Sequence, residues 1–225
     1  MPDPYESLNR SALVEALKRE KSILSNNFRH RFDDLKSLIR ESIGGNTFRA
    51  FQKMPEKPSV FFREWAFDRL STDKTIFSLQ NVFSQDEYDE WIKDFAKDLY
   101  DSWKGRMGDD KAISYGPRMK LCNLLLKRVI LWNKIEERNK NLLITFLHVP
   151  LDQYTLVAIR NCIDSDSERD IIGKIPKRPT MNLVRNEPMY FEIQNVIRSI
   201  ANDAGVPPIF LDALAWDKQH QNKTP

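Results

Sequence analysis

The chain has 225 residues, of which 41% are hydrophobic and 30% are charged, and its formal net charge is +3. This length suits one large domain or two small ones that share a core. The balance of 35 basic and 32 acidic residues excludes an argument for nucleic-acid binding from net charge alone. Two cysteines without a CxxC pair argue against a disulfide framework and a zinc site, and we expect no metal or other cofactor.

The hydrophobic residues do not point to a membrane. No apolar run approaches the roughly 20 residues that a membrane-spanning helix needs, and the opening sequence MPDPYESLNR holds no apolar signal segment. We therefore expect a cytoplasmic protein that does not enter a membrane.

Glycine is scarce, with 7 residues, whereas all-β folds need many turn residues. The composition thus favours an all-α fold of about eight helices. A composition shift near Gly105 suggests an N-terminal helical half over 1–105 and a C-terminal half over 106–218, which could enclose a cleft. The polar residues 219–225 are expected to form a disordered tail.

Apolar residues at helical spacing predict the elements of the first half. Four helices are expected, over 7–24, 26–43, 59–70 and 84–104. The pair Gly44-Gly45 can end the second helix, because glycine readily takes the left-handed conformation after a last turn. Ser84 and Glu87 form a capping box at the start of the fourth helix.

The helix expected over 84–104 is acidic. Its acidic residues outnumber Lys93 and Lys97; they are Asp86, Glu87, Asp89, Glu90, Asp94, Asp98 and Asp101. Such a surface could hold a protein partner, and the alternative is ordinary surface charge that keeps the protein soluble.

The second half is predicted to contain helices over 114–132, 136–147, 152–163, 186–204 and 207–216. Between the third and fourth of these lies a charged, proline-containing stretch, 164–185, which we expect to be a loop. Loops of this length inside a compact domain are often functional or mobile.

The helix over 114–132 is apolar on most of its circumference, and Lys120, Asn123 and Lys127 interrupt it at spacings of three and four residues. These spacings place the three side chains on one face. Burying an unpaired ammonium group costs several kcal/mol. The stripe must therefore meet carboxylates, line a cleft or face water.

Asp152 follows Pro150 and stands where a helix is expected to begin. Its carboxylate can accept amide hydrogen bonds from Tyr154 or Thr155, which is worth about 1 kcal/mol. This capping role explains Asp152 without any catalytic function. The same geometry also fixes a carboxylate rigidly at the end of an element, as a catalytic acid or base requires.

A glycine-containing turn, a lysine on an apolar helix and the helix start Val-Pro-Leu-Asp at 149–152 follow one another in this chain. This order resembles the helix-hairpin-helix DNA glycosylases, over roughly residues 105–165. In that family glycine amides of the hairpin grip the DNA backbone, and a catalytic aspartate follows on the next helix. The resemblance implies that Asp152 is this aspartate and that Lys120 is the additional lysine of bifunctional members. The hairpin, ISYGPR at 113–118, has one glycine where the family usually has two.

Cleavage of an N-glycosidic bond builds positive charge on the sugar, which a fixed carboxylate stabilises, and an amine can instead attack the sugar carbon. The target base must leave the duplex and enter a pocket with aromatic walls. The expected pocket residues are Tyr115, Trp132 and Tyr154. The expected DNA contacts are Gly116, Arg118, Lys127, Arg128 and the cations of a stretch without acids, Lys174, Lys177, Arg178 and Arg185.

Three functions therefore remain open. The first is a DNA-acting enzyme that cleaves a base–sugar bond. The second is a non-catalytic helical module that binds a protein partner. The third is nucleic-acid binding without catalysis. No Walker loop, Rossmann fingerprint, G-x-S-x-G or H-E-x-x-H motif points to another enzyme class.

Overall fold

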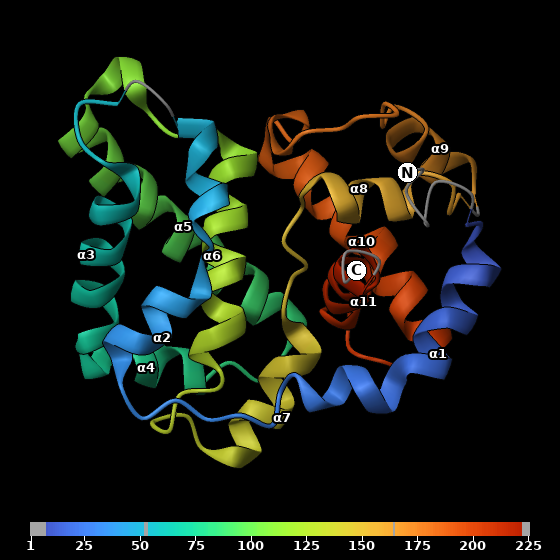
Figure 1. Ribbon diagram of the computed structural model, residues 1–225, viewed down its shortest axis with the longest axis horizontal. Helices are drawn as coiled ribbons and strands as arrows, with labels where there is room; N and C mark the ends of the chain where they lie inside the picture. The colour runs from blue at the N-terminus through green and yellow to red at the C-terminus, as the bar shows by residue number, and fades with distance from the viewer. Residues whose placement is uncertain (1–7, 52–53, 164, 222–225) are drawn as a thin grey trace. The chain divides into compact units, whose positions relative to one another are not determined.

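The computed structural model describes residues 8–51, 54–163 and 165–221, and these residues form an all-α fold without strands (Figure 1). They form eleven α-helices: α1 (Arg10–Asn26), α2 (Leu35–Ser42), α3 (Pro58–Ser71), α4 (Asp73–Gln80), α5 (Gln85–Met107), α6 (Tyr115–Val129), α7 (Glu137–Phe146), α8 (Gln153–Ile159), α9 (Asp166–Ile172), α10 (Glu187–Ala204) and α11 (Phe210–Gln221). Short 3₁₀ helices lie at Gly45–Phe51, Asp109–Lys111 and Met181–Leu183. The all-α expectation is confirmed. None of the helices in these ranges has both the length and the apolar character that a bilayer crossing requires.

Several predicted helix starts are confirmed by their hydrogen bonds. Ser84 Oγ accepts from the Glu87 amide at 3.2 Å, and Glu87 reaches back to the Phe83 amide at 2.7 Å. Asn186 caps α10 through the Met189 amide. At the other end of α10, Gly205 has a φ of 61°, the left-handed conformation that glycine favours.

The predicted helix over 26–43 is wrong in its first part, because α2 begins only after Asp34. The Phe32 amide donates to the Leu131 carbonyl at 2.8 Å, and the Asn133 amide donates to the Phe32 carbonyl at 2.9 Å. These bonds fix Phe32 in an isolated parallel bridge with Trp132. Backbone groups engaged in this way cannot continue a helix.

The stretch 164–185 is not a continuous loop. Ser165 Oγ accepts from the Glu168 amide at 3.3 Å and thereby caps α9, and a 3₁₀ turn follows at Met181–Leu183. At the chain end, α11 extends to Gln221, so part of the expected tail over 219–225 is helical. Residues 222–225 lie outside the described residues.

The described residues divide into two units that are not continuous in sequence. The first unit holds 8–29, 115–120, 147–163 and 165–221; the second holds 30–51, 54–114 and 121–146. This division differs from the expected halves 1–105 and 106–218, since the N-terminal helix belongs with the C-terminal ones. Helix α6 contributes its first residues to one unit and the remainder to the other.

In the first unit, α1 packs along α10 and α11 (Figure 1). Leu13 and Leu17 of α1 are fully buried there, and the rings of Phe28 and Phe210 stack with centroids 5.6 Å apart. Helix α11 also packs on α8. This packing buries the start of α8, where the candidate site lies.

In the second unit, α3 packs against α2, α4 and α5. Its core is aromatic: the rings of Phe61 and Trp103 meet edge to face at 5.4 Å, and those of Trp65 and Phe95 lie 5.1 Å apart. The Trp65 indole donates to Asp98 at 2.8 Å. The prediction that this aromatic helix would be buried holds for Phe61, Phe62 and Trp65. It is wrong for the rest of the circumference, because Phe67 is half-buried and the charged residues of α3 are exposed.

Candidate functional site

Lys120 and Asp152 lie side by side in the first unit. Lys120 Nζ is 3.5 Å from Asp152 Oδ2, and the two side chains retain 13% and 11% of their exposure. The residues are 32 positions apart in the sequence, yet the first turns of α6 and the start of α8 bring their charged groups together. A largely buried amine and a largely buried carboxylate therefore share one place and keep limited access to solvent.

The two oxygens of Asp152 have different partners. Oδ1 accepts from the amides of Tyr154 and Thr155, at 3.0 and 3.1 Å, which is the predicted N-cap of α8. Oδ2 faces Lys120. The capping bonds fix the carboxylate while the other oxygen meets the amine, so capping and a chemical role are compatible in this residue.

The electrostatic surroundings of Asp152 favour its protonated form. Burial raises the pKa of Asp152 above its ordinary value of 3.8, and it outweighs the lowering by Lys120 and the two capping amides. A second buried carboxylate, Asp212 in the first turn of α11, raises the pKa further. A largely buried amine beside a carboxylate whose pKa is raised forms a site that can hold and exchange a proton.

Sequence reasoning missed Asp212. The signal was present, since Asp212 is an acid inside the apolar run IFLDALAW, residues 209–216. A charged residue on an otherwise apolar helix needs a partner or a function. The same argument had singled out Lys120.

The segment that leads into Asp152 is held by α10. Gln194 forms hydrogen bonds with both backbone groups of Val149: its Oε1 accepts from the amide at 3.1 Å, and its Nε2 donates to the carbonyl at 2.8 Å. One residue earlier, His148 Nδ1 is 2.9 Å from the hydroxyl of Tyr190, and both side chains are buried. These contacts make the approach to the candidate site rigid.

The expected base-pocket residues do not all gather in one unit. Tyr115 lies in the first unit, where its ring meets that of Tyr190 edge to face at 5.9 Å. Arg118 places its guanidinium 4.7 Å from the centre of the Tyr115 ring. Tyr154 lies at the start of α8, directly after the cap. Trp132 belongs to the second unit and is buried, so the site as described contains the two tyrosines only.

Gly116 has a packing role in the structure, and its expected contact with DNA stays a prediction. Its amide donates to the Val184 carbonyl at 3.0 Å. A Cβ atom at this position would lie 2.0 Å from the Met181 carbonyl oxygen. The glycine is thus required because the 181–184 segment packs directly on α6, and its amide is already engaged.

The stripe predicted on α6 does not simply face water. Asn123 is 1% exposed, Lys120 is largely buried, and Lys127 is half-buried. Lys127 and Arg128 belong to the second unit, so of the basic α6 candidates only Arg118 and Lys120 belong to the unit that holds Asp152.

Four cations lie in the stretch that docks on α6. The side chains of Lys174, Lys177, Arg178 and Arg185 are exposed and have no ion pair within the described part of the chain. Ile175, Pro179 and Val184 between them are buried and anchor the stretch. The Val184 carbonyl accepts a hydrogen bond from Gly116, which precedes Lys120 by one turn of α6. Arg185, the residue after Val184, therefore lies close to the candidate site.

The described residues contain no cluster of three or more His, Cys, Asp or Glu side chains suited to a metal ion. Comparisons with protein-family models, with curated protein sequences and with solved structures give no match to this chain.

Proposed function

We propose that the protein cleaves the N-glycosidic bond of a base in DNA, with Lys120 and Asp152 as its catalytic pair. The observation that carries the proposal is the 3.5 Å approach of Lys120 Nζ to Asp152 Oδ2 at a largely buried position. A structural ion pair at the surface would need neither this burial nor a carboxylate fixed by two amides. Strongly perturbed ionisable groups cluster at functional sites.

The chemistry follows from the two groups. Asp152 accepts a proton from Lys120, and the neutral amine attacks C1′ of the target nucleotide. A bond forms between Nζ and C1′ as the bond from C1′ to the base breaks, and the base leaves with the bonding electrons. Asp152 then returns the proton to the departing base. The C1′–O4′ bond of the sugar breaks next, O4′ takes one proton from Nζ, and a protonated Schiff base remains between Lys120 and C1′, which borohydride can reduce. Its raised pKa, caused mainly by burial, suits a group that both accepts and donates a proton.

DNA would approach through the exposed cations of the stretch 174–185. Phosphate contacts by lysine and arginine supply most of the sequence-independent affinity for DNA. Tyr115 and Tyr154 are the aromatic side chains of the same unit that would flank an extruded base.

The test uses purified full-length protein with duplex oligonucleotides that each carry one deaminated, oxidised or alkylated base. Asp152→Asn keeps the cap, since asparagine caps helices as well as aspartate, but it removes the proton acceptor. We expect base release to fall by about 10²–10⁴-fold. Lys120→Gln should abolish the covalent adduct that borohydride traps between protein and DNA.

The matched controls are Asp101→Asn and Lys97→Gln, which disrupt an exposed Lys–Asp ion pair on α5. Both should retain the activity. The proposal is overturned if the wild-type protein releases no base from any of these substrates, or if Asp152→Asn is as active as the controls.

A second candidate, nucleic-acid binding without catalysis, is favoured by the four exposed cations, which have no ion pair with any residue that the structure describes. It predicts that Asp152→Asn leaves DNA affinity and every other property of the complex unchanged. Only replacement of the four cations would then weaken DNA binding.

A further inference from the structure

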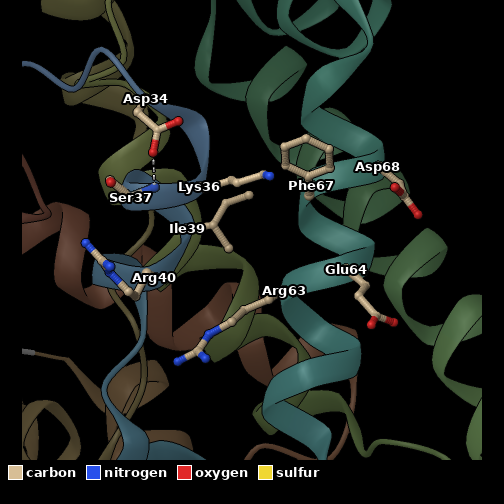
Figure 2. Close-up of a pocket in the computed structure, with 9 residues that line it drawn as sticks. All are labelled: Asp34, Lys36, Ser37, Ile39, Arg40, Arg63, Glu64, Phe67 and Asp68. Atoms are coloured by element: carbon tan, nitrogen blue, oxygen red, sulfur yellow. Dashed lines mark hydrogen bonds between the residues drawn. The ribbon is translucent and has the colours of Figure 1, made fainter.

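The second unit contains a pocket that the proposed function does not use. It lies between α2 and α3, has a volume of about 650 Å³ and is shown in Figure 2. Its lining residues are Asp34, Lys36, Ser37, Ile39, Arg40, Arg63, Glu64, Phe67 and Asp68. Pockets of roughly 300–1,000 Å³ are the usual size for small-molecule ligands.

The carboxylates of this pocket are largely engaged elsewhere. Asp34 Oδ2 accepts from the Ser37 amide at 2.7 Å as the N-cap of α2. Glu64 pairs with Arg106 at 3.0 Å. Figure 2 shows Glu64 and Asp68 pointing away from α2, on the far side of α3 from Ile39.

The cations of the pocket, by contrast, are available. Arg40 on α2 and Arg63 on α3 are exposed, and neither has an ion pair among the described residues. Both residues line the pocket; in Figure 2 the Arg63 side chain extends from α3 toward α2, and the Arg40 side chain extends from α2 on the side away from α3. Two guanidinium groups from neighbouring helices suit a phosphate, whose oxygens accept paired N–H donors.

The lining also contains one aliphatic and one aromatic side chain, Ile39 and Phe67. Ile39 projects between the two helices, and the ring of Phe67 stands opposite (Figure 2). Lys36 Nζ lies 5.5 Å from the centre of the Phe67 ring. An aromatic face stacks on any nucleobase irrespective of its sequence, and the long stem of Lys36 allows its ammonium to turn toward an anion.

We propose that this pocket binds a nucleoside monophosphate, with the phosphate between Arg40 and Arg63 and the base against Phe67 and Ile39. The assignment rests on one pocket whose lining contains an aromatic ring and two exposed arginines, neither of which has an ion pair among the described residues. It is independent of Lys120 and Asp152, which belong to the other unit.

The test is calorimetric titration of the full-length protein with adenosine 5′-monophosphate, and separately with adenosine and with inorganic phosphate. We expect saturable binding of the nucleotide and binding at least about tenfold weaker for each of its parts, because each part makes only one set of contacts. Arg40→Gln and Arg63→Gln should each weaken nucleotide binding by about tenfold. Phe67→Leu keeps the apolar bulk and should weaken nucleotide binding while leaving phosphate binding unchanged.

The matched control is Arg138→Gln, which removes an exposed arginine of α7 without an ion pair among the described residues. Its nucleotide affinity should equal that of the wild type. Exposed substitutions of this kind change stability little, and thermal unfolding checks that each variant is folded. The inference is overturned if the nucleotide shows no saturable binding, if inorganic phosphate binds equally well, or if Arg138→Gln weakens binding as much as Arg63→Gln.

Discussion

At the residue scale, the packing against α6 requires a glycine at position 116. Because a Cβ atom would lie 2.0 Å from the Met181 carbonyl oxygen, Gly116→Ala must displace backbone. We expect the free energy of unfolding to fall by about 1–3 kcal/mol, as measured by urea denaturation. Gly105→Ala in α5 is the control, since nothing lies within 4 Å of its Cβ position; there alanine should be neutral or stabilise by about 0.5–1 kcal/mol. Equal effects at both positions would contradict the packing argument.

The buried carboxylate of Asp152 should also leave a signature in the pH dependence of stability. Its pKa in the folded protein is raised above 3.8, mainly by burial. The folded state therefore binds more protons than the unfolded state between the ordinary and the raised pKa, and stability falls as the pH rises through this window. The stability of the wild type relative to Asp152→Asn should decline from pH 3.8 upward and then level off. Denaturant melts of the wild type and of Asp152→Asn at several pH values measure this decline.

The sequence predicts the roles of residues whose interactions are local. It does not predict interactions that depend on how distant helices pack together. The capping roles of Ser84, Asp152 and Asn186 depend on amides two or three residues away, so the sequence contains the whole interaction. The electrostatic influence of Asp212 on Asp152 depends on how α11 packs against α8. No spacing in the sequence encodes that distance.

At the scale of elements, α10 fixes the segment that leads into α8. Gln194→Met would leave the buried amide and carbonyl of Val149 without partners. Each unsatisfied group costs about 1–3 kcal/mol, so the free energy of unfolding should fall by at least about 2 kcal/mol. Glu192→Ala, at an exposed position of the same helix, should change it by less than about 0.5 kcal/mol. If Gln194→Met unfolds at the same urea concentration as Glu192→Ala, the two hydrogen bonds to Val149 contribute nothing to the stability of the fold.

The differences from the predicted elements at Phe32 and at α9 have distinct physical causes. The spacing around Phe32 predicts a helix, but its backbone is paired with Leu131 and Asn133, about 100 positions later. Helix α9 was missed because it is short and charged, although Ser165 and Glu168 carry the spacing of a capping box. The pairing of Phe32 depends on residues far away in the sequence, so local spacing cannot reveal it. The start of α9 depends on a local motif that the sequence does contain.

At the scale of the whole molecule, charge is unevenly distributed although the net charge is only +3. The stretch 174–185 in the first unit carries four exposed cations and no acid, while α5 in the second unit is rich in acids. This distribution is why the overall balance of charge says little about DNA binding. A local surface, and not the sum over the chain, sets the electrostatic affinity for a polyanion.

The dependence of DNA affinity on salt measures this surface directly. Each phosphate contact contributes a slope of about −0.9 to a plot of log K against log salt concentration. Replacing Lys174, Lys177, Arg178 and Arg185 by glutamine should therefore reduce the magnitude of the slope by up to about 3.6. The control replaces the exposed Lys74 and Arg138 of the second unit and should leave the slope unchanged. Because all four cations are exposed and lack ion pairs among the described residues, their loss should not unfold the protein. An unchanged slope in the quadruple variant would show that DNA does not meet this stretch, and the proposed approach to Lys120 and Asp152 would then be wrong.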